Sequence, residues 1–378
     1  MRVLHITPYV ASKFGGPSQV IKDMVLANKL AGIKADILTT SAGLTDEDKI
    51  KLKNFYQGHD SNLIIQQISK LGLWHYAPLM KEWLEKNRSN YDLIHLHIPF
   101  TYPFAVGAEA AKKADIPYVI SSHGLLSQYC LKQKYLKKKM YLELFERKRI
   151  NASSCLFVTT DFEANEIAFH NFKTEIKIMP LAVENKGQRK ENYSNSEALK
   201  IVCTARLHPI KNIPILLRAV ERVYAKGFQI SLDIAGEGTS GYENMLRNLV
   251  KLLNIDQIVK FHGHLSTKDV NNLLLQSDVF VILSSHENFC LSAAEASAVG
   301  LPVILSDQVG IATEVKQAEA GLIVPVGDVS ETTDALIKMF APSMREKYGN
   351  NGDDLAKNCF SIQRLSSELN SNYSAILN

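Results

Sequence analysis

Ten short runs of apolar residues recur along this chain of 378 residues, and segments with helical periodicity separate them. Short runs rich in Val, Ile and Leu that alternate with helices are typical of parallel strands buried on both faces of a sheet. The pattern therefore predicts an α/β fold with doubly wound parallel sheets. The expected strands are Val3–Thr7, Lys34–Thr39, Leu93–His97, Tyr118–Ser122 and Leu156–Thr159, followed by Leu199–Thr204, Gln229–Ala235, Ile258–His262, Val279–Leu283 and Val303–Ser306.

A polar stretch, Glu184–Lys200, separates the two series of strands and contains hardly an apolar residue. It predicts a linker between an N-terminal domain at 1–182 and a C-terminal domain at 183–360, and it argues against a single barrel. A chain of 378 residues also fits two domains. The expected helices are Ser18–Ala31, Pro103–Ala114, Lys132–Ile150, Ile213–Lys226, Tyr242–Leu253, Ser292–Val299 and Ser361–Leu377.

Composition excludes several classes of protein. Apolar residues make up 46% and charged residues 22%, so the chain can bury large cores and is not disordered. The five cysteines are widely spaced without a C-x-x-C pair, which favours reduced thiols in the cytoplasm over disulfides or a zinc cage. The first residues lack the pattern of a secretory signal, and no run approaches the roughly 20 apolar residues of a membrane span.

The net charge of +4 hides an asymmetry between the two halves. Residues 1–180 contain 24 basic and 17 acidic side chains, whereas residues 181–378 contain 19 and 22. Much of the first excess lies in residues 132–149, where basic residues and an apolar stripe alternate. This segment is either a solvated outer helix or a contact with an anionic membrane surface. Nucleic acid is a poor candidate, since no reader motif appears.

Two glycine segments are candidates for binding an anion. Gly15 and Gly16 follow the first strand and precede a helix. Either their backbone binds an anion at the start of that helix, or the turn from strand to helix requires small residues. The segment Gly236–Gly241 matches G-x-G-x-x-G between a strand and a helix. The dinucleotide fingerprint also requires an acidic residue about 20 positions later at the end of the next strand. That strand ends in His262, so an NAD-dependent oxidoreductase remains a weak alternative.

Charged side chains follow two strands of the second series. Arg206 and Lys211 lie in the loop after one strand, where a cationic pair suits a diphosphate and a solvated loop is the other interpretation. Glu287 and Glu295 are eight residues apart, on a loop and on the helix after it. Carboxylates at these positions can accept hydrogen bonds from sugar hydroxyls. Alternatively, Glu287 caps the helix and Glu295 forms an ion pair on its surface. His123 lies at the end of a strand, where it has either a structural or a functional role. His95 and His97 do not form a complete set of metal ligands.

These segments, in this order, resemble the retaining nucleotide-sugar glycosyltransferases of the GT-B fold, specifically glycosyltransferase family 4. The resemblance spans nearly the whole chain and includes the E-x7-E signature of that family. One departure is Cys290, where the family commonly has Gly, so the sugar pocket would be strained if the loop needs φ > 0. The segments that carry the resemblance are Gly15-Gly16, His123-Gly124, Arg206 with Lys211, Ala235–Gly238, Phe261–Gly263, Glu287–Glu295, Gly300–Ile304 and Asp307.

The resemblance implies two such domains that face each other across a cleft, an N-terminal acceptor domain and a C-terminal donor domain, with residues 361–378 returning to the first. It implies catalytic roles for His123 and Glu287 beside the transferred sugar, with Glu295 on the ribose. No metal or other cofactor is expected. The implied donor-binding residues are Gly15, Gly16, Arg206, Lys211, Gly236, His264, Leu265, Glu287, Asn288, Phe289, Cys290, Leu291, Ser292 and Glu295.

The implied activity is transfer of a hexose, with retention, from a nucleotide sugar to a glycan or lipid-linked saccharide in polysaccharide biosynthesis. UDP-glucose is the favoured donor. The expected location is the cytoplasm, with peripheral contact at the inner face of the membrane through residues 132–149. Alternatives are a GT-B phosphorylase, for which no cofactor-bearing lysine is evident, and a non-catalytic nucleotide-sugar binder.

Overall fold

The ten expected strands all form, and each of their ends lies within one residue of its predicted position. The computed structural model describes residues 1–69, 72–132, 135–183, 187–193 and 198–378. Its chain divides into two compact units, Met1–Ala182 with Ile362–Asn378 (unit 1) and Val183–Ser361 (unit 2). Each unit is built on its own parallel sheet.

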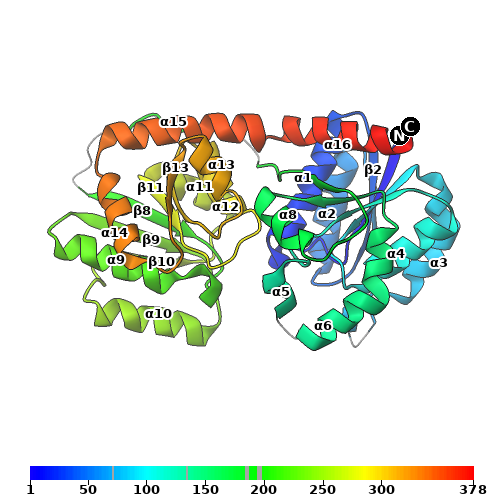
Figure 1. Cartoon of the computed structure of the whole chain (residues 1–378), viewed down its shortest axis with the longest axis horizontal. Coiled ribbons are helices and arrows are strands. Elements are labelled where there is room, and N and C mark those ends of the chain that lie inside the picture. Colours follow the sequence, from blue (N-terminus) through cyan, green and yellow to red (C-terminus); the bar gives the residue numbers. More distant parts are fainter. Residues whose placement is uncertain (70–71, 133–134, 184–186, 194–197) are drawn as a thin grey trace. The chain divides into compact units, whose positions relative to one another are not determined.

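Unit 1 contains a seven-stranded parallel sheet in the order β3-β2-β1-β4-β5-β6-β7. Its strands are buried because helices cover them, and the final helix α16 (Ile362–Leu377) packs against α1 (Gly16–Leu30) in this unit (Figure 1). The strands are β1 (Arg2–Ile6), β2 (Lys34–Thr40), β3 (Leu63–Gln66), β4 (Leu93–His97), β5 (Tyr118–Ser121), β6 (Cys155–Val158) and β7 (Ile176–Ile178). The other main helices are α2 (Asp46–Gly58), α3 (Pro78–Asn87), α4 (Tyr102–Lys113) and α8 (Asp161–Ala168).

Unit 2 contains a six-stranded parallel sheet in the order β10-β9-β8-β11-β12-β13. Its strands are β8 (Leu199–Thr204), β9 (Ile230–Ala235), β10 (Val259–Gly263), β11 (Val279–Ile282), β12 (Val303–Ser306) and β13 (Gly321–Val324). Its main helices are α9 (Ile213–Ala225), α10 (Ser240–Leu252), α11 (Thr267–Gln276), α12 (Leu291–Ala298), α13 (Ala312–Gln317), α14 (Val329–Lys338) and α15 (Pro342–Cys359).

Strand order reverses between β1 and β4 in unit 1 and between β8 and β11 in unit 2. In open parallel sheets, ligands bind outside the carboxyl ends of the strands at such a switch point. The loops after these four strands are therefore where each unit is expected to bind a ligand.

The polar stretch predicted as a linker is only partly a linker. Within its described residues 187–193, Lys190 and Tyr193 are buried against unit 2, where the Lys190 ammonium donates to the Ser277 carbonyl at 2.6 Å. Arg189 forms an ion pair with Asp353 at 3.0 Å. These side chains have partners far along the chain, and the polarity of Lys190 did not indicate exposure to solvent. The remainder, 184–186 and 194–197, lies outside the described residues.

The basic segment, expected as one helix over 132–150, contains four helical elements, and the last three follow one another without a break from residue 135 to residue 151. These are α5 (Gln128–Lys132), α6 (Tyr135–Tyr141), the π-helical turn η4 (Leu142–Glu146) and α7 (Arg147–Asn151), while residues 133–134 lie outside the described part. The π-turn places the Glu146 carboxyl in the interior, 3.4 Å from the Arg149 guanidinium. Burial raises the pKa of Glu146 to about 7, although Arg149 acts in the opposite direction.

This buried carboxyl predicts a pH-dependent stability. The folded protein holds the Glu146 proton between pH 4.5, the ordinary value, and about 7, whereas the unfolded chain releases it. This group therefore lowers the free energy of unfolding as pH rises through that window. Thermal midpoints of the wild type and Glu146→Gln at pH 5 and pH 8 test this. The thermal midpoint of the variant, relative to that of the wild type, should be higher at pH 8 than at pH 5. An equal difference between the two proteins at both pH values would contradict this role of Glu146.

Candidate active site

Two loops meet at the switch point of unit 2, one after β8 and one after β11. The first turns into α9 at Asn212, which has a left-handed backbone with φ 50°. Its side-chain amide donates to the Leu283 carbonyl at 2.9 Å, and the Ser285 amide donates to the Ile210 carbonyl at 2.7 Å. These bonds fix the two loops against each other, so side chains from sequence positions more than 70 residues apart share one site.

Lys211 and Glu287 form an ion pair across these two loops. Both side chains are largely shielded, with exposures of 13% and 24%. Burial lowers the pKa of Lys211, but Glu287 and Cys290 raise it by more, and the net pKa lies above its ordinary value of 10.5. The Ser284 hydroxyl also donates to the Glu287 carboxylate, at 3.3 Å. The site thus contains a charged lysine, and an anionic ligand can replace Glu287 as its ionic partner.

Arg206 lies on the same loop as Lys211 and is exposed. Within the described residues it forms no ion pair, so its guanidinium can bind an anion without first breaking one. A guanidinium offers a fork of donors and a lysine a single point charge. Together they can bind a diphosphate, which is the chemistry that the sequence suggested for them.

The loop after β11 leads into α12 through a strained residue. Cys290 precedes this helix with φ 85° and ψ 73°, so the departure from Gly does place a non-glycine residue in the left-handed region. Phe289 is buried against Phe360, with ring centroids 5.2 Å apart, so packing accounts for its side chain. Asn288, Leu291 and Ser292 are half-buried around the helix start, and Glu295 is half-buried on α12.

Backbone contacts with the loop after β12 fix this segment. The Glu287 amide donates to the Gln308 carbonyl at 3.0 Å, and the Gly310 amide donates to the Glu287 carbonyl at 2.8 Å. A Cβ atom at Gly310 would lie 1.8 Å from the Asn288 carbonyl oxygen, which explains the glycine. The backbone of the loop is therefore held independently of the Glu287 side chain.

The glycines of the G-x-G-x-x-G segment have a packing role. A Cβ atom at Gly236 would lie 1.9 Å from the Ala205 carbonyl, and one at Gly238 would lie 2.2 Å from the Leu207 carbonyl. The Gly238 amide already donates to the Glu243 carboxylate at 2.7 Å. Close approach to the loop after β8 thus explains both glycines without a dinucleotide, and it places Gly236 next to the loop of Arg206.

Two of the residues expected to bind the donor lie on the loop after β10, two strands from β8. His264 is exposed and Leu265 is half-buried. The neighbouring His262 bonds to Asp233 at 2.6 Å, which ties the end of β10 to β9. The structure therefore places His264 and Leu265 at the same carboxyl edge as the ion pair, but apart from it.

In unit 1, the expected glycines lie at the start of α1. Gly15 has φ 73° and precedes the helix, and Gly16 is its first residue. A Cβ atom at Gly15 would meet nothing within 4 Å, so its backbone angle, not crowding, accounts for this glycine. The glycine pair leaves the beginning of α1 open to a ligand at the end of β1.

His123 follows β5 and is half-buried, with φ 48°. Ile98 and Phe100, after the neighbouring strand β4, also have positive φ, at 61° and 67°. Positive φ is unusual for a β-branched residue such as Ile98, and strained backbone of this kind concentrates at functional sites. Burial lowers the pKa of His123 to about 4, so its imidazole is neutral near pH 7.

Sequence reasoning missed the residues behind His123. Its Nε2 lies 3.0 Å from Nδ1 of His97, and Nε2 of His97 lies 3.0 Å from Nδ1 of His5. The available signal was the pair His95-x-His97 on one face of a strand, but the third histidine comes from β1. Only the pairing of β1 with β4 brings His5 to them.

Burial also predicts which thiols react. Burial raises the pKa to about 11 for Cys290 and to about 12 for Cys155 and Cys203. Since the thiolate is the nucleophile, these thiols should react roughly 100-fold more slowly than the half-exposed Cys130 and Cys359. Iodoacetamide labelling of the native protein at pH 8, followed by peptide mass spectrometry, tests this order. Rapid labelling of Cys290 would contradict the buried position of its side chain.

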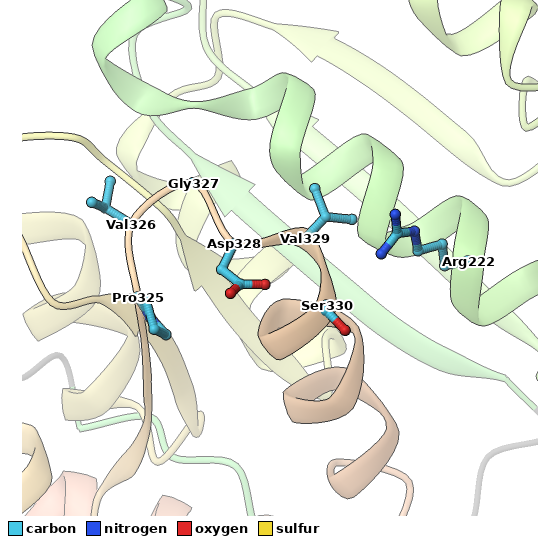
Figure 2. Close-up of a pocket in the computed structure, with 7 residues that line it drawn as sticks. All are labelled: Arg222, Pro325, Val326, Gly327, Asp328, Val329 and Ser330. Carbon is cyan, nitrogen blue, oxygen red and sulfur yellow. The ribbon is translucent and has the colours of Figure 1, made fainter.

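One hollow of about 450 Å³ in unit 2 lies away from these residues. Figure 2 shows its lining: Arg222 extends from α9, and residues 325–330 come from the loop after β13 and the start of α14. Asp328 caps α14 by accepting from the Glu331 amide at 2.9 Å. The hollow contains none of the expected site residues, so it is not assigned to the donor.

Comparison with known families identifies the class of protein. Residues 14–185 match the family described as "Glycosyltransferase Family 4", and residues 184–354 match "Glycosyl transferases group 1". The two matches together extend over both units, and the chain belongs to the family 4 glycosyltransferases of the GT-B type. The predicted membership of family 4 is thereby confirmed.

Curated relatives support the same class at low identity. A D-inositol 3-phosphate glycosyltransferase of Actinosynnema mirum is 22% identical over 94% of this chain and 91% of its own. The D-inositol 3-phosphate glycosyltransferase of Nocardioides sp. is 23% identical over 82% of this chain and 75% of its own.

No described helix is long and apolar enough to cross a membrane.

Solved structures show the fold. Sucrose-phosphate synthase from Thermosynechococcus elongatus superposes with a TM-score of 0.79 at 18% identity, covering 100% of this chain and 99% of that one. HepE from Anabaena, solved in complex with UDP-glucose, superposes with a TM-score of 0.77 at 18% identity, covering 99% and 100%. The predicted GT-B fold is confirmed, with its two Rossmann-like parallel-sheet domains.

Proposed function

We propose that the chain transfers a hexose, with UDP-glucose as the best candidate donor, to a saccharide acceptor with retention of the anomeric configuration. The observation that carries this proposal is the Lys211–Glu287 pair beside the exposed Arg206 at the switch point of unit 2. Two cations match a nucleoside diphosphate, and a carboxylate matches sugar hydroxyls. The complexes of HepE with UDP and with UDP-glucose support the choice of donor.

In the proposed mechanism, fixed charges stabilise the departing diphosphate. Arg206, Lys211 and the amides at the start of α12 neutralise the charge that develops as the sugar–phosphate bond breaks, a role for which no metal ion is needed. The acceptor oxygen bonds to the sugar carbon on the same face, and its proton goes to the leaving phosphate. Glu287 orients the sugar, and Glu295 accepts hydrogen bonds from the ribose hydroxyls.

The two units have separate proposed roles. Unit 2 binds the donor, with His264 and Leu265 against the base, because the cations are at its switch point. Unit 1 binds the acceptor and contributes His123 beside the sugar and Gly16 near the distal phosphate. The open start of α1 and the strained backbone around His123 support these assignments.

A donor screen tests the proposed function. Thermal shifts and slow hydrolysis are measured with UDP-, GDP- and ADP-sugars, and NAD is included. We expect a shift and hydrolysis with UDP-sugars, most with UDP-glucose. Equal shifts with all three bases would remove the base assignment. Binding of NAD alone would favour the oxidoreductase, and UDP-sugar binding without transfer to any acceptor would favour a non-catalytic binder.

We also propose that the acceptor is a glycan or lipid-linked saccharide of polysaccharide biosynthesis, reached by peripheral contact of unit 1 with an anionic membrane. Leu136, Met140 and Leu144 recur every four residues, and their exposures are 80%, 61% and 57%. A solvated outer helix would turn such a stripe inward, whereas here it is exposed next to Lys137–Lys139. Apolar and basic side chains together suit a membrane surface.

Vesicle binding tests this surface. Lys137, Lys138 and Lys139 are replaced together by Gln, and sedimentation with vesicles containing phosphatidylglycerol is compared with pure phosphatidylcholine. The wild type should sediment with the anionic vesicles only, and the triple variant should lose most of this binding. Equal sedimentation of both proteins would favour the solvated helix.

A further inference from the structure

A chain of hydrogen bonds connects the interior of unit 1 to His123. It begins at the side-chain amide of Asn28 on α1, whose Nδ2 lies 2.9 Å from Nε2 of His5. Nδ1 of His5 lies 3.0 Å from Nε2 of His97, and Nδ1 of His97 lies 3.0 Å from Nε2 of His123. Asn28, His5 and His97 are fully buried. We call these four residues the histidine relay.

The first member of the relay sets the direction of every bond. An amide Nδ2 can only donate, so Nε2 of His5 accepts and its single proton is on Nδ1. The same step repeats at His97 and then at His123, because a neutral imidazole has one donor and one acceptor. Burial lowers the pKa of His5 to about 3 and that of His97 well below its ordinary value, which keeps both rings neutral.

We infer that Asn28, His5 and His97 are positioning residues that fix His123 as the tautomer with its proton on Nδ1. In that tautomer, Nε2 accepts from His97, and the Nδ1 donor has no partner in the described part of the chain. A neutral donor at the carboxyl end of β5 suits the lone pair of a sugar hydroxyl or of a phosphate oxygen. Its use on a sugar rests on the proposed function, whereas the tautomer is a property of unit 1 alone.

Two histidines of the relay region, together with His95, lie close enough to one another to suggest a metal site. Nitrogen atoms of His5, His95 and His97 lie within 4.8 Å of one another. However, the nitrogens of His95 bond to the Tyr373 hydroxyl at 2.6 Å and to the Ser121 hydroxyl at 2.8 Å. The His95 and His97 rings are stacked, 4.2 Å apart at 22°, so their in-plane lone pairs run side by side and do not converge on one ion.

His95 forms a separate branch that provides a matched control. Its partner Tyr373 on α16 is buried and belongs to the same core, but it makes no hydrogen bond to the relay. Tyr373→Phe removes one buried hydroxyl, and Asn28→Leu removes one buried amide. Both changes therefore disturb the same region, and only the second removes the donor that sets the direction of the relay.

Histidine tautomers are measured directly by long-range ¹H–¹⁵N NMR on protein with ¹⁵N-labelled histidine, with the His123 signals assigned from a His123→Gln spectrum. The wild type and Tyr373→Phe should show His123 with its proton on Nδ1. Asn28→Leu should lose that single tautomer and show a mixture. The wild-type spectrum alone tests the inference if Asn28→Leu does not fold.

Three results would overturn the relay: a wild-type His123 with its proton on Nε2, an unchanged single tautomer in Asn28→Leu, or one equivalent of zinc bound by the wild type with loss of the His5 and His97 proton signals. Turnover of the donor is measured on the same samples. A tautomer change without a change in turnover would leave the relay in place and remove the proposed role of His123, so the two proposals fail separately.

Discussion

Replacing Arg206 with alanine is expected to weaken UDP binding by roughly 10- to 100-fold, because hydrogen bonds to a charged group contribute about 1.5–3 kcal/mol. Arg206 is exposed and forms no ion pair among the described residues, so its removal breaks no ion pair in that part of the protein. The thermal midpoint without ligand should therefore stay near that of the wild type. Titration calorimetry with UDP measures the affinity of each protein.

A second arginine of the same unit provides the control. Arg222 is exposed on α9 and lines the shallow hollow away from the candidate site (Figure 2). Arg222→Ala changes the net charge by the same amount, so any general effect of charge on UDP should appear in both variants. Similar losses in the two variants, or undiminished binding by Arg206→Ala, would contradict a direct contact between Arg206 and the diphosphate.

The strands that the sequence did not predict are all at sheet edges. β3, β7 and β13 are three or four residues long and half-exposed. Lys177 interrupts β7, whereas β3 contains Leu-Ile-Ile and β13 contains Leu-Ile-Val, short apolar runs from which a strand could have been predicted. A central strand is buried on both faces and its composition shows this, whereas an edge strand can carry polar residues. The β7 sequence, Ile-Lys-Ile, is an example of a run too short to be distinguished from a loop.

The residues of the candidate site in unit 2 were predictable individually, but their pairing was not. Arg206, Lys211 and Glu287 each follow a predicted strand, and ligands of parallel sheets bind at strand ends. That Lys211 meets Glu287 depends on β8 lying next to β11, which is a property of strand order. The histidine relay depends in the same way on β1 lying next to β4, since His5 and His97 are 92 residues apart.

Replacing Glu287 with glutamine is expected to lower kcat for transfer of the sugar by about 100-fold or more, through the loss of a preorganised charge at the reacting sugar. Glutamine keeps the size of the side chain, and the backbone bonds of residue 287 to Gln308 and Gly310 do not depend on the carboxylate. The loop should therefore keep its shape. Single-turnover kinetics with the donor found by the screen measure this effect.

Glu287 has a second possible effect, through its partner Lys211, and UDP affinity separates the two. If Glu287 acts on the sugar, Glu287→Gln should bind UDP within about threefold of the wild type while kcat falls, since UDP lacks the sugar. If it mainly keeps Lys211 charged, burial would dominate in Glu287→Gln and lower the pKa of that lysine. UDP affinity would then fall toward that of Lys211→Met, most strongly at high pH. This second result would reassign Glu287 from the sugar to the diphosphate.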